Sequence, residues 1–361
     1  MRYIDEFRDR GLVKGLVRDI ESASTRKTNL MEVCGTHTMA IFRSGIRRIL
    51  PASVNLISGP GCPVCVTSQS DIDRMLYLAG RKDTIITTFG DMLKVPGTES
   101  SLEKKHASGA DIRIVYSPLD ALAIAEANPR KKIVFLAVGF ETTAPIIASV
   151  ISDAAEKKIS NFFVYCCHKT IPAAMKALLE TREIRIDGFL CPGHVSSIIG
   201  SRAYEFIARD FNVPCAISGF EPTDILETIL MLIRQKKDGR ACVEIQYKRA
   251  VQEQGNVKAK EMMDRVFEPS DGDWRGLGVI HDSGLKIRKA YRFFDATAEF
   301  RIPALQAKEP RGCACAEVLR GIKTPRQCGL FAKTCTPETP FGPCMVSTEG
   351  TCAAWFKYNR N

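Results

Sequence analysis

The residues best suited to chemistry in this chain are its cysteines, and six of the fourteen lie in one stretch near the C-terminus. That stretch is rich in proline and glycine, and it holds Cys313, Cys315, Cys328, Cys335, Cys344 and Cys352. In a reducing cytoplasm such a cysteine content indicates metal binding or thiol chemistry rather than a structural disulfide framework. Six thiols in this setting favour an iron–sulfur cluster held by four thiolates, with two left over. Structural zinc is the alternative, but its ligands usually come as two Cys-x2–4-Cys pairs, and these spacings do not fit.

A Cys-x-x-Cys motif, Cys62 to Cys65, follows a glycine turn and leads into a helical pattern. Free backbone amides at the start of a helix stabilise a thiolate, which is the arrangement of dithiol oxidoreductases. Half of a zinc site is the alternative, but no second Cys-x-x-Cys is present to complete it. The Lys-Ser/Thr ending of a phosphate-binding loop is also absent. The sequence therefore predicts a redox-active dithiol here.

Cys34 lies three residues before His37 and is the third candidate. At this spacing a thiol and an imidazole can lie close together, and a protonated imidazole lowers the pKa of the thiol. A single buried cysteine is also commonly an inert packing residue, so these residues alone leave both interpretations open. Glu141 and Glu221, each after a Gly-Phe pair, are candidates either for proton transfer or for capping a helix.

The elements that must position these residues follow one pattern from about residue 53 to residue 240. Short apolar runs end in glycine or proline and lead into helical segments, which is typical of parallel sheets covered by helices. The expected strands are 54–58, 84–88, 112–116, 133–138, 162–166, 188–191 and 215–218. In such sheets the loops at the carboxyl ends of the strands form the binding crevice. We therefore expect Cys34, Cys62 and Cys65 to converge in one crevice.

These patterns predict an α/β fold class: two similar parallel-sheet α/β domains, plus a smaller C-terminal iron–sulfur domain with few regular elements. The expected boundaries are 31–130 for the first domain, 131–240 for the second and 241–361 for the third, with residues 1–30 packed on the third. A hairpin is expected around residues 282–284. Because the tail has few apolar residues, we expect it to fold only around a metal group.

Bulk composition excludes several other classes. The net charge is +10, but the basic clusters are scattered and not interleaved with aromatic residues, so no nucleic-acid partner is predicted. No apolar run approaches the roughly 20 residues that a membrane helix needs, so no membrane association is predicted. The N-terminus lacks the apolar core of a secretory signal. We expect a soluble, cytoplasmic protein.

Several motifs together resemble the HypD family of hydrogenase maturation proteins. In chain order they are MEVCGTHTMAIFRSGIRRILP, SGPGCPVCVT, VGFETTAP, CPGHVSSIIG, SGFEP and PFGPCMVSTEGTC. Members of that family take part in building the Fe(CN)2CO group of nickel–iron hydrogenases, with a small chaperone, HypC, and a cyanide-delivering protein, HypE. The resemblance implies that Cys34 holds the iron unit with His37 beside it, and that Cys62 and Cys65 are the redox dithiol next to that site.

The resemblance also assigns roles within the tail. Cys313, Cys328, Cys335 and Cys352 match the family spacing for a [4Fe-4S] cluster. Cys315 and Cys344 are then a second thiol pair, an arrangement similar to that of ferredoxin:thioredoxin reductase. The implied function is a redox-active assembly scaffold rather than a turnover enzyme. The alternative is a cluster-dependent thiol–disulfide reductase acting on another protein, which shares the tail and the Cys-x-x-Cys motif but does not need Cys34 or His37.

Overall fold

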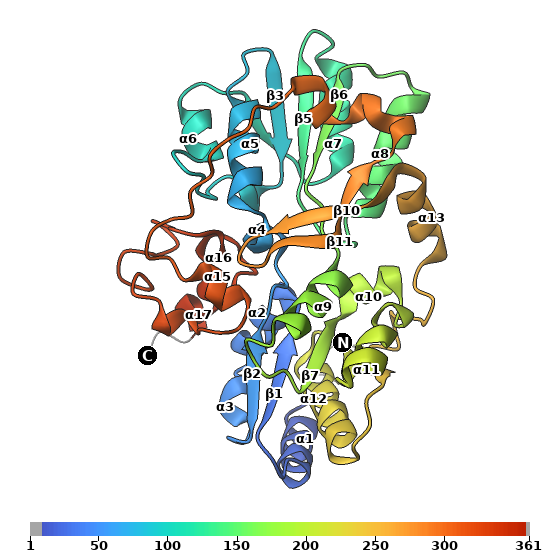
Figure 1. The fold of residues 1–361 in the computed structure, drawn as a ribbon, viewed down its shortest axis with the longest axis vertical. Coiled ribbons are helices and arrows are strands. Elements are labelled where there is room, and N and C mark those ends of the chain that lie inside the picture. Colours follow the sequence, from blue (N-terminus) through green and yellow to red (C-terminus); the bar gives the residue numbers. More distant parts are fainter. Residues whose placement is uncertain (1–8, 359–361) are drawn as a thin grey trace.

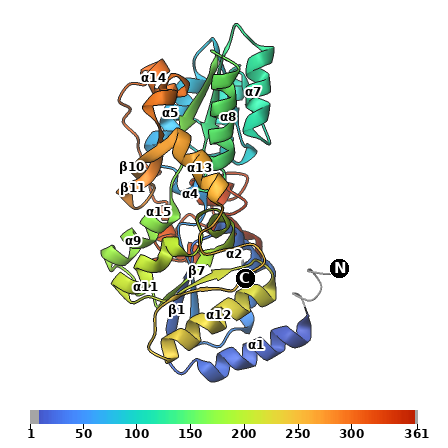
Figure 2. The ribbon, with the colours of Figure 1, turned by 90° about the vertical axis from the view of Figure 1, so that its right-hand side faces the viewer.

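The computed structural model describes residues 9–358, and it places two parallel β-sheets one above the other along the long axis (Figure 1). The first sheet has five strands in the order β2-β1-β7-β8-β9, and the second has four in the order β4-β3-β5-β6. A two-stranded antiparallel hairpin, β10–β11, lies between them (Figures 1 and 2). The expected α/β class is confirmed.

Parallel pairing holds throughout both sheets. The first sheet consists of β1 (Thr28–Glu32), β2 (Val54–Ser58), β7 (Gly188–Pro192), β8 (Cys215–Ser218) and β9 (Val243–Ile245). The second consists of β3 (Thr84–Thr88), β4 (Ile112–Ile114), β5 (Lys132–Ala137) and β6 (Phe162–Cys166). The hairpin consists of β10 (Phe267–Trp274) and β11 (Gly278–Ile287).

Helices cover both faces of each sheet, as parallel strands require. The first sheet packs on α1 (Arg10–Ala23), α2 (Gly35–Arg43), α3 (Ile46–Ile49) and α12 (Pro222–Lys237) on one face, and on α9 (Ile171–Thr181), α10 (Gly193–Ile199), η3 (Arg202–Tyr204) and α11 (Glu205–Phe211) on the other. Around the second sheet lie α5 (Gln69–Ala79), η2 (Gly90–Met92), α6 (Leu102–Ala107), α7 (Pro118–Ala127), α8 (Ala144–Glu156), α13 (Val257–Val266), η4 (Lys289–Phe294) and α14 (Ala296–Phe300). The remaining short helices are α4 (Pro63–Val66), α15 (Cys315–Leu319), η5 (Pro325–Gln327), α16 (Pro343–Val346) and α17 (Thr351–Tyr358).

The two sheets do not divide the chain at residue 130, so the expected domain boundary is wrong. That boundary falls inside the second sheet, between β4 and β5, which both pair with β3. The first sheet is discontinuous in sequence, because β1 pairs with β2 on one side and with β7 on the other. Strand runs that are apolar on both faces predict that a sheet exists, but pairing between distant strands depends on tertiary packing.

Residues 241–361 are not a single unit either. β9 completes the first sheet, whereas Met263 of α13 and Phe267 and Ile287 of the hairpin belong to the core of the second. The cysteine-rich unit begins only near residue 303. Helix α1, expected on this third part, packs instead against α12 and buries Ile20 there (Figure 2).

The hairpin turn also differs from the expected place. Residues 282–284 lie inside β11, opposite an irregularity of β10 between Ser270 and Gly272, and the turn itself is at 275–277. Asp282 has a φ of 52°, so the polar run that indicated a turn instead marks a β-bulge.

One of the hydrophobic core clusters extends across both sheets and the tail. It joins Phe189 of the first sheet, Val134 of the second and Leu319 of the tail, together with Cys62, Cys65, Cys315 and Cys344. The carboxyl ends of strands from both sheets therefore meet the tail in the region between the two sheets (Figure 1). Over the described range 9–358, no helix has the length and apolar character that a membrane span requires.

Candidate functional site

The loops that carry Cys34 and Cys62 touch each other beyond the ends of β1 and β2. The Gly35 amide donates to the Gly61 carbonyl at 2.8 Å. Gly61 has no room for a side chain, because a Cβ there would lie 2.1 Å from the Cys34 nitrogen. Adjacent parallel strands thus bring the two expected thiol sites together, as the carboxyl-end rule predicts.

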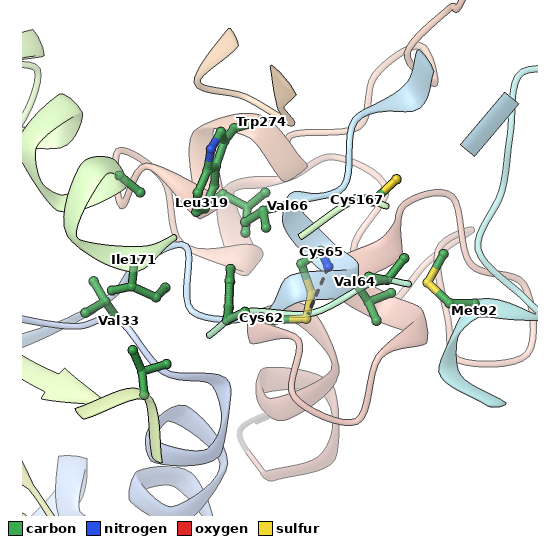
Figure 3. Packing of buried hydrophobic residues seen from close by; sticks show 14 of the residues in the cluster. Val33, Cys62, Val64, Cys65, Val66, Met92, Cys167, Ile171, Trp274 and Leu319 are labelled. Carbon is green, nitrogen blue, oxygen red and sulfur yellow. Dashed lines mark hydrogen bonds between the residues drawn. A yellow bond between two sulfur atoms is a disulfide. The ribbon is translucent and has the colours of Figure 1, made fainter. Parts of the chain in front are cut away.

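Cys62 and Cys65 are joined as a disulfide in a buried apolar setting (Figure 3). Their Cα atoms are 5.2 Å apart, within the usual range for a disulfide. Cys62 is the N-cap of α4, and its Sγ accepts a hydrogen bond from the Cys65 amide at 3.2 Å. Figure 3 shows the pair in the same apolar cluster as Val33, Val64 and Ile171, so the disulfide is shielded from water.

Cys34 is the N-cap of α2, and its side chain is almost fully buried. Burial, and after it the nearby Glu349 carboxylate, raise the pKa of the Cys34 thiol to about 12. Hydrogen bonds from the backbone of His37 and Thr36 act in the opposite direction. The thiol is therefore protonated in this closed state, and the site must open or bind a metal to give the thiolate.

His37 does not activate Cys34 as an imidazolium, contrary to one interpretation of the sequence. Burial lowers the pKa of His37 to about 4, so its ring is neutral at neutral pH. Its Nε2 lies 3.2 Å from the Ser218 carbonyl and 2.9 Å from the Gly219 carbonyl, and so must carry the hydrogen. Its Nδ1 is buried and has no hydrogen-bond partner among the described residues, which leaves an unused acceptor on the ring.

The tail closes over both loops. The Thr36 hydroxyl donates to Glu349 Oε1 at 2.6 Å, and a Cβ at Gly35 would lie 2.5 Å from the Glu349 Cβ. Cys65 Sγ lies 3.9 Å from the Pro343 carbonyl. Asp91, in the short helix η2 that follows β3 of the second sheet, accepts from the hydroxyls of Ser347 and Thr348 at 3.3 and 3.4 Å. Segment 343–349 thus covers Cys34 and contacts the loops of both sheets.

The six tail cysteines gather in one place. The Cys344 thiol lies close enough to those of Cys315 and Cys352 for each to influence the pKa of the other. Cys313 lies close enough to Cys315, Cys328 and Cys335 for their charges to interact. Cys315 and Cys344, expected as a pair, are therefore near one another, and their redox pairing stays a prediction.

The sulfur positions suit a multi-iron cluster better than a single zinc ion. With Zn–S bonds of about 2.3 Å, tetrahedral thiolates lie about 3.8 Å apart. In the described residues, three or more possible ligand atoms lie within 4.8 Å of one another only at Asp271, His281 and Asp282, which are exposed. The Phe341 amide donates to Cys335 Sγ at 3.4 Å, and backbone amides of this kind stabilise cluster thiolates. The residues present fit the cluster that the sequence resemblance implies.

The two acids that the sequence singled out have structural roles. Glu221 caps α12 in a capping box with Asp224. Glu141 Oε1 accepts from the Ile171 amide at 3.0 Å and so caps α9, on the neighbouring loop. Its Oε2 is buried without a partner, and burial raises the pKa of Glu141 to about 7.

Glu32 and Glu349 were not identified from the sequence, although both lie within the family-like motifs. Glu32 ends β1, and its Oε1 accepts from the Ser58 hydroxyl at 2.6 Å and from Arg47 at 3.3 Å. Ser58 is the last residue of β2. This buried carboxylate therefore links the ends of β1 and β2, where the two cysteine-bearing loops begin. Their positions close to Cys34 and Cys352 in the sequence could have indicated that both acids belong to the site.

The fold and these contacts define a class: a two-sheet α/β protein with a buried thiol site closed by its own cysteine-rich tail. The HypD family model, described as "Hydrogenase formation hypA family", matches residues 11–359. The chain is 48% identical to the hydrogenase maturation factor HypD of Azotobacter vinelandii, over 100% of this chain and 97% of that protein. It is 45% identical to that of Rhodobacter capsulatus, over 99% and 98% of the two chains. It is 44% identical to that of Escherichia coli K12, over 100% and 99%. The chain belongs to the HypD family.

Proposed function

We propose that this protein is a hydrogenase maturation factor, and that Cys34 holds the Fe(CN)2CO unit while it is assembled. The observation that carries the proposal is the contact between the Cys34 loop and the Cys62–Cys65 loop beneath the cysteine-rich tail. One thiol suited to iron thus lies beside a dithiol able to change its redox state. The maturation role is supported by the hydrogenase maturation factors to which the chain is similar.

The residues around Cys34 fit a low-spin iron cargo. A soft thiolate suits such iron, and the Thr36 and His37 amides favour that thiolate. The burial that keeps Cys34 protonated also keeps out water and oxygen. Cargo entry then requires segment 343–349 to move away from Gly35, and a HypC-type chaperone would supply a further ligand to the iron. A HypE-type protein would deliver cyanide.

The tail would supply electrons. Cys313, Cys328, Cys335 and Cys352 would hold a [4Fe-4S] cluster, which transfers one electron at a time when bound. Cys315 and Cys344 form the adjoining thiol pair. Pro343, next to Cys344, contacts Cys65 Sγ, so the second pair lies beside the first. Each pair takes up two electrons and two protons when its disulfide becomes two thiols.

Infrared spectroscopy of the anaerobically purified complex with the small chaperone tests the proposal. We expect cyanide and carbonyl bands from the wild type and none from Cys34→Ala. Cys242→Ala, which removes a half-buried cysteine beside β9, is the matched control and should keep the bands. Bands of full intensity in Cys34→Ala would remove Cys34 as the scaffold residue.

A cluster-dependent thiol–disulfide reductase is the second candidate, favoured by the disulfide between Cys62 and Cys65. In that case the cluster would serve to reduce another protein's disulfide, and Cys34 would be dispensable. Cys34→Ala would then support hydrogenase maturation at the wild-type rate, whereas Cys62→Ala would abolish it. The scaffold proposal expects both variants to fail.

A further inference from the structure

The exposed side of the tail carries an excess of positive charge near the expected cluster ligands. From residue 303 to 358 the chain has seven Lys and Arg against four Asp and Glu. Three of the basic residues, Arg311, Arg326 and Lys333, each stand two positions before an expected ligand: Cys313, Cys328 and Cys335, respectively. All three are exposed.

These three positions lie on loops that contact one another. Cys328 Sγ is 3.9 Å from the Gly312 carbonyl, and a Cβ at Gly312 would lie 3.8 Å from the Leu330 side chain. The Cys335 amide donates to the Leu330 carbonyl at 2.9 Å. The three basic residues therefore border one face, which we call the ligand-loop face, made of residues 311–313, 326–330 and 332–335.

The ion pairing of this face differs from that of the other basic residues nearby. Arg320 pairs with Glu183, and Lys323 pairs with Glu317. Within residues 9–358, Arg311 and Lys333 form no ion pair, whereas Arg326 lies over the Trp355 ring at 5.7 Å. Two of the three charges therefore have no counter-charge among the residues that the structure describes.

The centre of the ligand-loop face has little side-chain bulk. Gly312, Gly329 and Ala332 are exposed, and Cys313 and Cys328 are only partly buried. A partner seated here could thus approach the two ligand sulfurs closely. By contrast, Cys315 and Cys344 are buried on the inner side, toward Cys65.

We propose that the ligand-loop face is the docking site of an acidic one-electron carrier protein that reduces the tail cluster. This inference rests on the proposed function, because it takes the four tail cysteines as cluster ligands. Reduction of one disulfide to two thiols consumes two electrons and two protons. A one-electron carrier must dock twice for each disulfide and leave in between, and the protons come from solvent.

Such an encounter must be fast and short-lived. Complementary charge raises association rates and is screened by salt, whereas a large apolar interface would slow release. Electron-transfer complexes bury less than about 1,200 Å² in total. A face with three charges around a centre of small residues suits an interface of that size. Neutralising three charges should lower the association rate about ten-fold at low salt.

The test compares two triple variants of the full chain. The first, Arg311→Gln, Arg326→Gln and Lys333→Gln, neutralises the ligand-loop face. The second, Lys104→Gln, Lys158→Gln and Lys237→Gln, removes the same charge from exposed positions elsewhere. The probe is a small acidic two-iron ferredoxin. Its binding to each immobilised protein is measured by surface plasmon resonance at about 20 mM and 200 mM salt, since screening grows over that range.

We expect the first triple to bind the ferredoxin about ten-fold more weakly than wild type at low salt, and the second to match wild type. Equal loss in both triples, or loss in neither, would overturn the docking site. Binding of a DNA duplex that is stronger than ferredoxin binding, and is lost in the first triple alone, would overturn it in favour of nucleic acid.

Failure of the cluster assignment is measured separately. Iron and sulfide content is determined for all three proteins, and cluster reduction by an uncharged small reductant is followed by absorbance. Charge-dependent ferredoxin binding by a wild type that holds no iron would keep the docking face and remove the cluster from the proposed function. Iron lost only from the first triple would mean that the charges stabilise the cluster, and would overturn the docking role.

Discussion

Glu141 is predicted to make the folded state progressively less stable as pH rises through neutrality. Its carboxyl group is buried, one oxygen has no partner, and burial raises its pKa to about 7 from 4.5. Because the folded state holds this proton more tightly than the unfolded state does, stability is lost between the two pKa values as pH increases. The linkage relation gives a loss of about 2.5 kcal/mol between pH 5 and pH 8 from this one group.

The assay is urea unfolding of the wild type and Glu141→Gln at pH 5, 6, 7 and 8. The amide can still accept from the Ile171 amide but cannot titrate, so the pH dependence of the variant should be flatter by about 2.5 kcal/mol over this range. Glu156→Gln, an exposed carboxylate at the end of α8, is the control and should leave the slope unchanged. Parallel pH profiles for the wild type and Glu141→Gln would refute the reasoning, because they would mean that the carboxylate is solvated in the folded protein.

Three further outcomes are expected. Gly61→Ala should lower the free energy of unfolding by about 1–3 kcal/mol and speed alkylation of Cys34, because the new methyl group forces the two cysteine-bearing loops apart. Gly80→Ala is the control: the nearest atom to its new methyl group is 3.4 Å away, so neither the stability nor the alkylation rate should change. Glu32→Ala should lower the free energy of unfolding, measured by chemical denaturation, by about 3 kcal/mol, because it leaves Arg47 and Ser58 without their buried acceptor. A loss equal to that of Ser58→Ala would argue against this link between β1 and β2. Cys315→Ser should retain iron after anaerobic reconstitution yet fail in hydrogenase maturation, whereas Cys328→Ala should lose iron; normal maturation by Cys315→Ser would leave the thiol pair without a relay role.

Several strands were predictable from the sequence. The expected runs 54–58, 84–88, 162–166 and 215–218 coincide with β2, β3, β6 and β8, because each is a short run rich in apolar, aromatic or β-branched residues. β1 was missed, since Thr28, Asn29 and Glu32 interrupt its apolar pattern. It becomes a strand because β2 and β7 pair with it on both sides.

The site was predictable where it depends on local order, and not where it depends on distant partners. The meeting of Cys34 and Cys62 follows from the rule that loops converge at the carboxyl ends of parallel strands, although β1 itself was not identified from the sequence. The neutral state of His37 does not, because its carbonyl partners are 181 and 182 residues away. The contact of Thr36 with Glu349 spans 313 residues, so no spacing rule indicates it.

The interleaved order of the strands has a consequence for synthesis of the chain. β1 lies inside its sheet between β2 and β7, yet β7 follows roughly 160 residues later, about 8–30 s at ribosomal speeds of 5–20 residues per second. During that interval β1 and β2 have only each other, and a two-stranded pair is marginal on its own. Cys34, Cys62 and Cys65 therefore leave the ribosome as unprotected thiols, close in sequence and free to form the wrong disulfide. Growth in an oxidising environment should harm this protein first in its nascent chain, before the first sheet is complete.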